Sequence, residues 1–318
     1  YRTFRYTAGL VILCVALMAM GCEAVSNYVR RRIIQADDAP RKRIVAGDGK
    51  IVTRVWTKSK VIIVSTLGVL AVLTVYGFAQ MDYGEVNLLN ATLGAFNNFG
   101  VMVFHPGTDG YWTMGELFND LVLTISLAVL TTLIGSILAL LLALPAACNL
   151  SNKVVSNIIK LVFSVIRAIP TIIWVLIFVV SISLGAEACI VGMMFHTVAF
   201  LAKAFSESFE ELDQGSLDAL RSTGASWWEI VTHCVIPEKA NDILSWIFIR
   251  FENNFVNTVV IAALCGSGGI GYELFLAANF YFSMHAVGLI TYMCLAVSVI
   301  LEVISTQLRK RLIVNRSA

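Results

Sequence analysis

The stretch SFEELDQGSLDALRSTGASWWEIVTHCVIP, residues 208–237, is the longest polar interval in the C-terminal two-thirds of a very apolar chain. Its pattern predicts two short helices joined by a sharp corner. The first helix is expected from Ser208 to Ser222. Gly224 stands where a left-handed residue would end it, because glycine adopts that conformation without a Cβ penalty. We therefore expect a helix–turn–helix that lies outside the bilayer, between hydrophobic spans, as a docking element.

The second helix of this stretch has its own start and stop signals. Ser226 and Glu229 have the S-x-x-E spacing of a capping box, in which each side chain accepts a hydrogen bond from the other residue's backbone N–H group. Pro237 is expected to end this helix and to begin the next one, because proline has no N–H group and its fixed φ suits the first turn of a helix.

The composition places the chain in a membrane. Of the 318 residues, 58% are hydrophobic and 14% are charged, whereas a soluble domain is about a quarter charged. The net charge of +2 gives no indication of a nucleic-acid partner, and we expect none. The cysteines form no C-x-x-C pair and have no histidine at ligand spacing, so we expect small apolar residues in helices rather than disulfides or a zinc site. They are residues 14, 22, 148, 189, 234, 265 and 294.

Segments of about 20 apolar residues cross a bilayer, and the chain has about seven of them. The candidates are residues 8–26, 61–80, 121–146, 161–184, 189–206, 242–264 and 285–307. The chain opens on Tyr1 without a signal-peptide pattern, so we expect its natural start to be missing. No A-x-A-like site follows the first apolar segment, which is therefore expected to be a retained span.

The distribution of basic residues predicts the orientation. Residues 27–60 hold ten Lys and Arg residues, whereas residues 61–152 hold none, and cytoplasmic loops are enriched in these residues. We therefore expect the 27–60 loop and the C-terminus in the cytoplasm, and the N-terminus and residues 81–120 outside.

Two segments beside the spans have patterns of their own. The run IVAGDGKIVT in the basic loop has β-prone residues on both sides of Asp48-Gly49, which is a hairpin signal; a solvated basic loop near anionic lipid is the alternative. Residues 84–104 have apolar residues at helical spacing and predict an amphipathic helix on the outer membrane surface. Small and hydroxyl residues in the span 121–146 predict close helix contacts: Thr124, Ser126, Thr131, Thr132, Gly135 and Ser136.

The polar stretch resembles the coupling segment of a known family. Membrane subunits of binding-protein-dependent ABC importers carry E-A-A, three residues, Gly, nine residues and I-x-L-P. Here Asp218-Ala219-Leu220, Gly224 and Cys234-Val235-Ile236-Pro237 stand at the same spacing, with mild substitutions. In the family this segment sits in a cleft of the cytoplasmic ATPase. The resemblance therefore implies ATPase coupling by Asp218, Ala219, Leu220, Gly224, Ser226 and Pro237. An ordinary amphipathic loop of another membrane protein is the other interpretation.

Three further runs are similar to the phosphonate-type permeases of that family. Arg167–Trp174 matches R-x-I-P-E-x-x-W with Thr171 in place of the acid, and His196–Lys203 matches H-T-x-x-x-x-x-K. The run Arg250-Phe251-Glu252-Asn253-Asn254 precedes the glycine-rich run Gly266–Gly271. The markers cover about residues 85–308 and leave the N-terminal span and basic loop unexplained.

The resemblance implies an all-α polytopic membrane protein of about seven transmembrane helices, with the type I, methionine-importer-like ABC importer core of five helices. The expected parts are an N-terminal helix and basic loop over 1–60, a second span and outer amphipathic segment over 61–120, the permease core over 121–308 with coupling helices at 208–237, and a cytoplasmic tail over 309–318.

Arg250 is the charged residue expected deepest in the membrane, roughly 20 Å along a helix that starts at Pro237. An intramembrane Arg is costly and usually faces a cavity or a partner. Arg250 therefore lines the path of an anion, or it makes a structural ion pair, for instance with Glu252 of a second copy. We expect His196, in mid-span, to be packed and hydrogen-bonded rather than catalytic. The residues expected along the path are Arg250, Glu252, Asn254, Arg167 and His196.

The run GSGGIG is expected to form a tight re-entrant turn at the outer gate, through Gly266, Gly268, Gly269 and Gly271. It follows no strand and opens no βαβ unit, so a phosphate-binding fingerprint is a poor interpretation. The histidines, residues 105, 196, 233 and 285, are spread over both sides and the middle of the membrane. No metal site and no catalytic residue are expected.

The chain contains no Walker A motif, G-x-x-x-x-G-K-[ST]. We therefore expect ATP and Mg²⁺ on a separate cytoplasmic ABC ATPase, and no enzyme activity or bound cofactor in this chain. ATPase subunits of this class form two-fold dimers, so one coupling motif per chain predicts that two copies pair around the path. An external substrate-binding protein is expected to deliver the ligand to this multi-pass protein of the inner (plasma) membrane, where lipid surrounds it.

The resemblance implies that the transported solute is a phosphonate, phosphite or phosphate, with methionine or thiamine as alternatives on the same fold. A membrane-embedded enzyme is a second class, but we find no converging acid, base or nucleophile for it. A channel or secondary transporter is a third class, for which Arg250 is the main support.

Overall fold

The computed structural model describes residues 21, 25–26, 28–29, 44–45, 51–52, 58–80 and 87–314. The chain divides into two compact units, with the boundary between Thr92 and Leu93. Most of the predicted first span, residues 8–26, lies outside the described residues.

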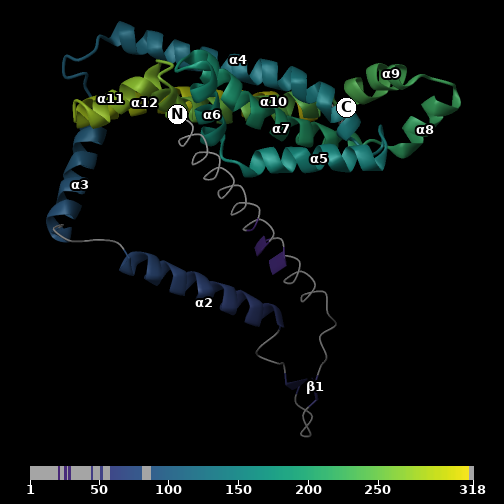
Figure 1. Ribbon diagram of the computed structural model, residues 1–318, viewed down its shortest axis with the longest axis horizontal. Helices are drawn as coiled ribbons and strands as arrows, with labels where there is room; N and C mark the ends of the chain where they lie inside the picture. Colours follow the sequence, from purple (N-terminus) through teal and green to yellow (C-terminus); the bar gives the residue numbers. More distant parts are fainter. Residues whose placement is uncertain are drawn as a thin grey trace. The chain divides into compact units, whose positions relative to one another are not determined.

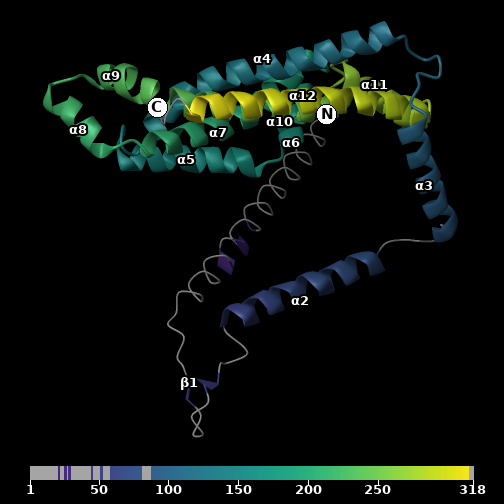
Figure 2. The same cartoon turned by 180° about the vertical axis from the view of Figure 1, so that it is seen from behind.

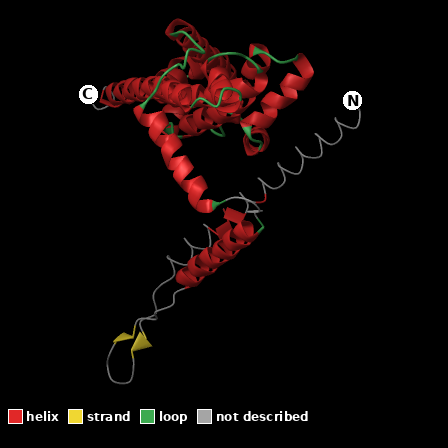
Figure 3. Cartoon of the chain, turned by 90° about the vertical axis from the view of Figure 1, so that its left-hand side faces the viewer, coloured by secondary structure: helices red, strands yellow, loops and turns green. Residues whose placement is uncertain are grey.

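The first unit contains a pair of short strands in the basic loop, drawn in yellow in Figure 3. Strands β1 (Ile44–Val45) and β2 (Ile51–Val52) are antiparallel. Ile44 is opposite Val52, and Val45 is opposite Ile51. This pairing confirms the strands predicted on either side of Asp48-Gly49.

The first unit also contains helix α2 (Lys58–Ala79). Over Lys60–Ala79 this helix is long and apolar enough to cross a membrane, and none of that segment is buried. An apolar helix without a buried face is typical of a span surrounded by lipid, in agreement with the predicted span 61–80.

The second unit is a helical bundle, shown from two sides in Figures 1 and 2. Its elements in chain order are α3 (Leu88–Phe104, which begins in the first unit), α4 (Met114–Ala146), α5 (Lys153–Ala168), α6 (Thr171–Ile182), α7 (Ala186–Glu210), α8 (Gln214–Ser222), α9 (Trp227–Ile230), the π-helix η1 (Val231–Val235), α10 (Ile236–Cys265), α11 (Ile270–Asn279) and α12 (Met284–Val314).

Several helices are longer than the sequence predicted. Helix α4 begins at Met114 rather than near residue 121, because the N-cap Thr113 and Glu116 in the first turn form a capping box. Helix α12 continues to Val314 and so includes part of the predicted tail 309–318. The predicted helix 84–104 is present as α3, and its place on the membrane surface stays a prediction.

The predicted span 161–184 is not one straight helix, because the chain bends sharply between α5 and α6. Helices α5 and α6 meet at an angle of 85°. Ile169 has extended dihedrals (φ −84°, ψ 124°) before Pro170, as expected from the clash of a proline ring with a helical residue before it. Besides this bent pair, five helices of the described residues are long and apolar enough to cross a membrane: α2, α4, α7, the segment Trp227–Cys265 and α12.

Small residues bring the central helices together, as the hydroxyl-rich pattern of 121–146 predicts. A Cβ at Gly135 of α4 would lie 2.6 Å from Thr197 Cγ2 of α7, and a Cβ at Gly192 of α7 would lie 2.5 Å from Val175 Cα of α6. Close backbone approach of this kind replaces the hydrophobic effect as the source of cohesion in a membrane. In both views, α8 and α9 lie at one end of the bundle and α11 lies at the other (Figures 1 and 2).

Candidate functional site

The corner predicted in the polar stretch is present. Gly224 has φ +83°, its N–H donates to Arg221 O at 3.1 Å, and Ala225 N–H donates to Leu220 O at 3.3 Å. These two bonds are those of a Schellman motif, in which a left-handed residue ends a helix and satisfies its last carbonyl groups. The hydrogen bonds therefore set the direction in which the chain leaves α8.

The start of the first helix differs from the prediction. Ser208 and Phe209 belong to the end of α7 and are buried. Helix α8 begins at Gln214, where the side chain of Asp213 accepts from Ser216 N at 3.0 Å as the N-cap. An aspartate at this position satisfies an N–H group that the helix itself leaves free, which separates α8 from α7.

The start of the second helix agrees with the prediction, and its end does not. Ser226 N donates to Glu229 Oε2 at 2.6 Å and Glu229 N donates to Ser226 Oγ at 3.4 Å, which completes the capping box. Pro237 does not end the helix. The backbone widens into the π-helix Val231–Val235, in which Ile236 N–H donates to Val231 O, and continues into α10. The wider turn accommodates a proline that cannot donate.

The polar stretch exposes its motif residues while one leucine anchors it. Leu217 is fully buried, at 0% exposure. Asp218, Ala219, Gly224, Ser226 and Pro237 are exposed, and Leu220 is half-buried. The backbone at the corner is thus fixed while these residues are accessible to another protein.

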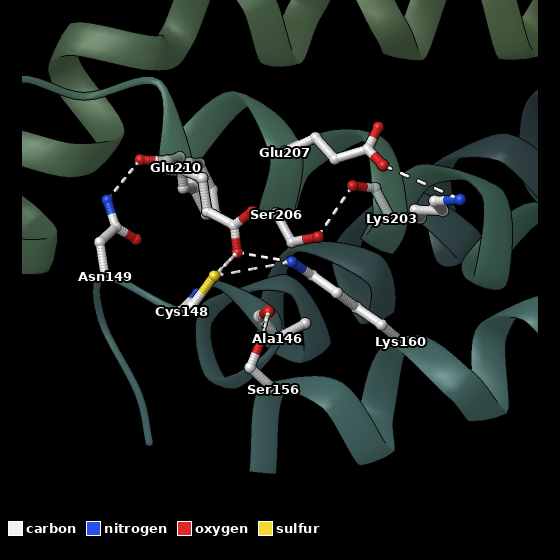
Figure 4. A network of polar contacts seen from close by, with 10 residues as sticks. Ala146, Cys148, Asn149, Ser156, Lys160, Lys203, Ser206, Glu207 and Glu210 are labelled. Atoms are coloured by element: carbon white, nitrogen blue, oxygen red, sulfur yellow. Dashed lines mark hydrogen bonds and ion pairs between the residues drawn. The ribbon is translucent and has the colours of Figure 1, made fainter. Parts of the chain in front are cut away.

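The loop between α4 and α5, residues 147–152, is bound to this region by a network that the sequence did not predict (Figure 4). Glu210, the last residue of α7, accepts from Cys148 N at 2.7 Å and from Lys160 Nζ at 2.5 Å. From the same loop, Asn149 Nδ2 donates to Phe209 O of α7 at 2.7 Å. We call residues 147–152 the α4–α5 loop.

The two short helices bind the same loop. Arg221 Nη2 of α8 donates to Asn149 O at 2.7 Å, and Trp227 Nε1 of α9 donates to Leu150 O at 2.9 Å. Both acceptors are backbone carbonyl groups, which every residue type has, so no sequence pattern marks these contacts. The α4–α5 loop therefore connects both helices of the corner to α4 and α5.

Arg250 lies inside the bundle, at 4% exposure. Its Nε and Nη2 atoms donate to Thr197 Oγ1 at 3.2 and 3.1 Å, and Nη2 lies 3.1 Å from His196 Nδ1. Its Cζ atom lies 5.3 Å from the centre of the Phe200 ring. His196 is thus half-buried and hydrogen-bonded, as predicted. The structure brings Arg250 and His196 together.

Asn254 holds this arrangement between three helices. Its Nδ2 donates to Thr132 Oγ1 of α4 at 2.9 Å, and its Oδ1 lies 3.2 Å from Thr197 Oγ1 of α7. Asn254, Thr132 and Thr197 are all almost completely buried. A buried amide with satisfied hydrogen bonds fixes the relative positions of the helices, so Asn254 positions Arg250 through Thr197.

Arg167 joins the same cluster, and Glu252 does not. The Cζ atom of Arg167 lies 5.5 Å from the centre of the Phe200 ring, the ring that Arg250 also contacts. Within the described ranges, no carboxylate lies within 4.0 Å of either guanidinium. Glu252 is half-buried, and it makes no ion pair with Arg250 of its own chain.

The glycine run at the other end forms a turn, with one exception. Gly266, Gly268 and Gly269 have positive φ values of 60°, 74° and 84°, which favour glycine. Gly271 instead lies in α11, where a Cβ would be 1.8 Å from Val259 O of α10. The turn was predictable from the sequence, but the close approach at Gly271 was not.

The same end holds a half-buried carboxylate, that of Glu273. Trp112 Nε1 donates to Glu273 Oε2 at 2.6 Å. Burial raises the pKa of Glu273 above its usual range, and the hydrogen bond from Trp112 acts in the opposite direction. No group of three or more His, Cys, Asp or Glu side chains in the described part of the chain is arranged to hold a metal ion.

The chain matches a protein family over more than half of its length. The sequence pattern of the family described as "Binding-protein-dependent transport system inner membrane component" matches residues 132–314. This region includes the polar stretch, the arginine cluster and the glycine run.

Individual relatives agree with this match. The phosphate-import permease protein of Mycolicibacterium smegmatis is 26% identical over 315 residues, which are 98% of this chain and 55% of the relative. The chain thus spans about half of that protein. The phosphite transport system permease protein of Stutzerimonas stutzeri is 27% identical over 63% of this chain and 74% of its own length. The methionine import system permease protein of Bacillus subtilis is 29% identical over 38% of this chain and 56% of its own length.

A solved structure shows the same fold. An inward-facing structure of a methionine ABC transporter superposes with a TM-score of 0.55 at 17% identity, over 63% of this chain and 97% of the other.

Proposed function

Since the chain belongs to the family of binding-protein-dependent transport system inner membrane components, we propose that it is the permease subunit of an ATP-driven importer. One observation carries this proposal: the corner at Gly224 holds the motif residues of the polar stretch exposed at one end of a membrane bundle. A cytoplasmic ABC ATPase docks on Asp218, Ala219, Leu220, Gly224, Ser226 and Pro237.

The orientation follows from where the basic residues lie. Lys160 pairs with Glu210 and Lys239 with Glu211, beside the polar stretch. Arg221 lies on α8, and Lys153 begins α5 next to the α4–α5 loop. Cytoplasmic loops are enriched in Lys and Arg. The end that holds the polar stretch therefore faces the cytoplasm, with the C-terminus, and the glycine run faces outside, with the N-terminus. Two copies of the chain pair around the path and match a dimer of ATPases.

The path runs between these ends. Arg250, Arg167, His196, Asn254 and Glu252 lie along it, and Gly266, Gly268, Gly269 and Gly271 belong to the outer gate. An external binding protein delivers a phosphorus oxyanion, and relatives named for phosphate and phosphite support this solute. Methionine is the second candidate, supported by a shorter match.

The α4–α5 loop transmits the motion of the ATPases. The Trp227→Phe, Arg221→Leu double variant keeps an aromatic ring at residue 227 and the glycine at the corner, and it removes both hydrogen bonds to the loop together with the ion pair of Arg221 with the exposed Asp218. Each bond contributes about 0.5–1.5 kcal/mol, so the chain should still fold. We expect fewer solute molecules transported per ATP hydrolysed, measured in proteoliposomes.

A matched control is Trp228→Phe. This tryptophan contacts the Trp227 ring edge-on, and its side chain donates no hydrogen bond within the described residues. An equal loss in the control, or an unchanged ratio in the double variant, would show that the loop contacts do not transmit motion.

The proposed function is tested by measuring ATPase activity of the complex in lipid nanodiscs. The chain is co-expressed with the ATPase and binding protein encoded beside it, and the binding protein is loaded with 2-aminoethylphosphonate, phosphate or methionine. We expect stimulation by a phosphorus oxyanion. Stimulation by methionine alone would contradict the proposal that the solute is a phosphorus oxyanion. If the chain does not associate with an ATPase, the proposed function is wrong.

A further inference from the structure

We propose that Arg167 and Arg250 form one oxyanion-binding site inside the permease, which takes a doubly charged, tetrahedral phosphorus oxyanion. This inference rests on the function proposed above. It adds that the permease itself selects among solutes, within the membrane. The observations that carry it are the charge of the cluster, its unused hydrogen-bond donors and its partial exposure.

The cluster has two positive charges and no counter-ion in the part of the chain that the structure describes. Both guanidiniums contact the same Phe200 ring, at 5.5 and 5.3 Å from its centre, so they share one small region. Guanidinium groups stay protonated in proteins, and a charge within a membrane protein generally pairs with an opposite charge or lines a path. Two neighbouring cations without a carboxylate are therefore stabilised by an anion.

Some N–H groups of the two arginines have no hydrogen-bond acceptor among the neighbouring side chains that the structure describes. Thr197 and His196 occupy Nε and Nη2, while Nη1 has no partner among the described residues. Because Arg250 can only donate, His196 Nδ1 accepts, and the proton of the neutral ring is on Nε2. The guanidinium of Arg167 donates no hydrogen bond within those residues. Free N–H groups on two guanidiniums suit an anion with several oxygen atoms.

The site is rigid on one side and open on the other. Arg250 is held through Thr197 by Asn254 and Thr132, all buried, which prepares its position before an anion arrives. Arg167, His196 and Phe200 are half-buried. Arg167 also precedes the bend at Pro170, and no side chain caps the first N–H groups of α6 beyond it, which adds positive potential on this side. An anion therefore reaches the site from the side of Arg167.

The charge of the site discriminates between the candidate solutes. A phosphate or phosphonate dianion balances two guanidiniums. A zwitterionic amino acid brings a single negative charge on its carboxylate, which leaves one guanidinium unbalanced. A phosphodiester headgroup of a lipid shares the phosphate chemistry, and the experiment separates this source from a free oxyanion.

The test compares Arg167→Gln with Lys203→Gln in the complete transporter. Arg167 is half-buried and donates no hydrogen bond, so its loss should not prevent folding. Lys203, on α7, pairs with Glu207 at 3.8 Å. Its replacement by glutamine is the matched control, because it also removes one positive charge. In proteoliposomes we expect Arg167→Gln to lower uptake of radiolabelled phosphate or 2-aminoethylphosphonate by about tenfold or more. ATPase stimulation by the loaded binding protein should persist, and Lys203→Gln should resemble the natural sequence.

Calorimetry in a phosphate-free maltoside detergent tests binding without the binding protein. Inorganic phosphate should bind the permease–ATPase complex, and Arg167→Gln should abolish that binding. Phosphorus analysis of the purified complex measures retained lipid. If Arg167→Gln lowers lipid content but leaves uptake unchanged, the arginines bind a headgroup and the proposal is overturned.

The structural ion pair between two copies is tested separately. If Arg250→Glu and Glu252→Arg each abolish assembly and the combined exchange restores it with normal uptake, Arg250 pairs with Glu252 of a second copy and the anion site is rejected. If the natural sequence and Arg167→Gln import an oxyanion equally well, this site is rejected and the proposed function stands. A chain that binds no ATPase rejects the function itself.

Discussion

A Gly271→Ala chain is expected to lose most of its folded protein, because alanine has no room at this crossing. A Cβ at residue 271 would lie 1.8 Å from Val259 O, 2.6 Å from its carbonyl carbon and 2.9 Å from its Cα. All three atoms are backbone of α10, which cannot move aside as a flexible side chain does. Helix α11 must therefore shift away from α10, and overpacking of this kind costs about 1–3 kcal/mol, and more where backbone is displaced.

The measurement is thermal unfolding of the purified permease in detergent, together with its yield from the membrane. The matched control is Gly115→Ala in α4, where the nearest atom is Thr113 Oγ1 at 3.9 Å. Replacing a helical glycine with alanine at an open position stabilises by about 0.5–1 kcal/mol. Equal unfolding temperatures for the two variants would contradict the close packing of α11 on α10.

A Gly224→Val chain is expected to reach the membrane in normal amounts and to transport almost no solute. Nothing lies within 4 Å of a Cβ at this exposed corner, so the bundle has no reason to unfold. The φ of +83° is the obstacle, because a left-handed conformation costs an L-residue about 1–2 kcal/mol, and a β-branched residue more. The corner relaxes by breaking the Schellman bonds, which turns α9 away from α8.

The matched control at this corner is Gly224→Asn, since asparagine tolerates the left-handed conformation. We expect the asparagine variant to keep ATPase stimulation by the loaded binding protein and the valine variant to lose it. Normal ligand-stimulated ATPase activity in Gly224→Val would show that the corner is not the docking element.

The local features of the fold could be read from the sequence because neighbouring residues produce them. At the end of α8, Gly224 N–H donates to the residue three positions earlier and Ala225 N–H to the residue five positions earlier, and Ser226 caps α9 with Glu229. The bend at Pro170 was not predicted, because residues 161–184 have the length and the apolar composition of a membrane span. The π-helix before Pro237 was not predicted, because a proline can either end a helix or be accommodated in it by a wider turn.

The candidate site could be predicted only in part. Arg250 was singled out by its charge in apolar surroundings, and Arg167 and His196 by runs that resemble the phosphonate-type permeases, but nothing in the sequence indicated that both arginines contact Phe200. The hydrogen bonds from Arg221 and Trp227 end on carbonyl groups of the α4–α5 loop, more than 70 residues away. Neither side of such a contact has a sequence signature.

The sequence by itself determined that this chain is a helical membrane protein with a sharp polar corner between two spans. Apolar length, capping residues and a left-handed glycine act within a few residues and leave patterns that can be read directly. Only the tertiary structure decided that Gly271 approaches Val259, that Asn254 joins three helices and that Arg167 and Arg250 share one ring. These arrangements depend on which helix faces meet, and that choice is made by packing between segments far apart in the chain.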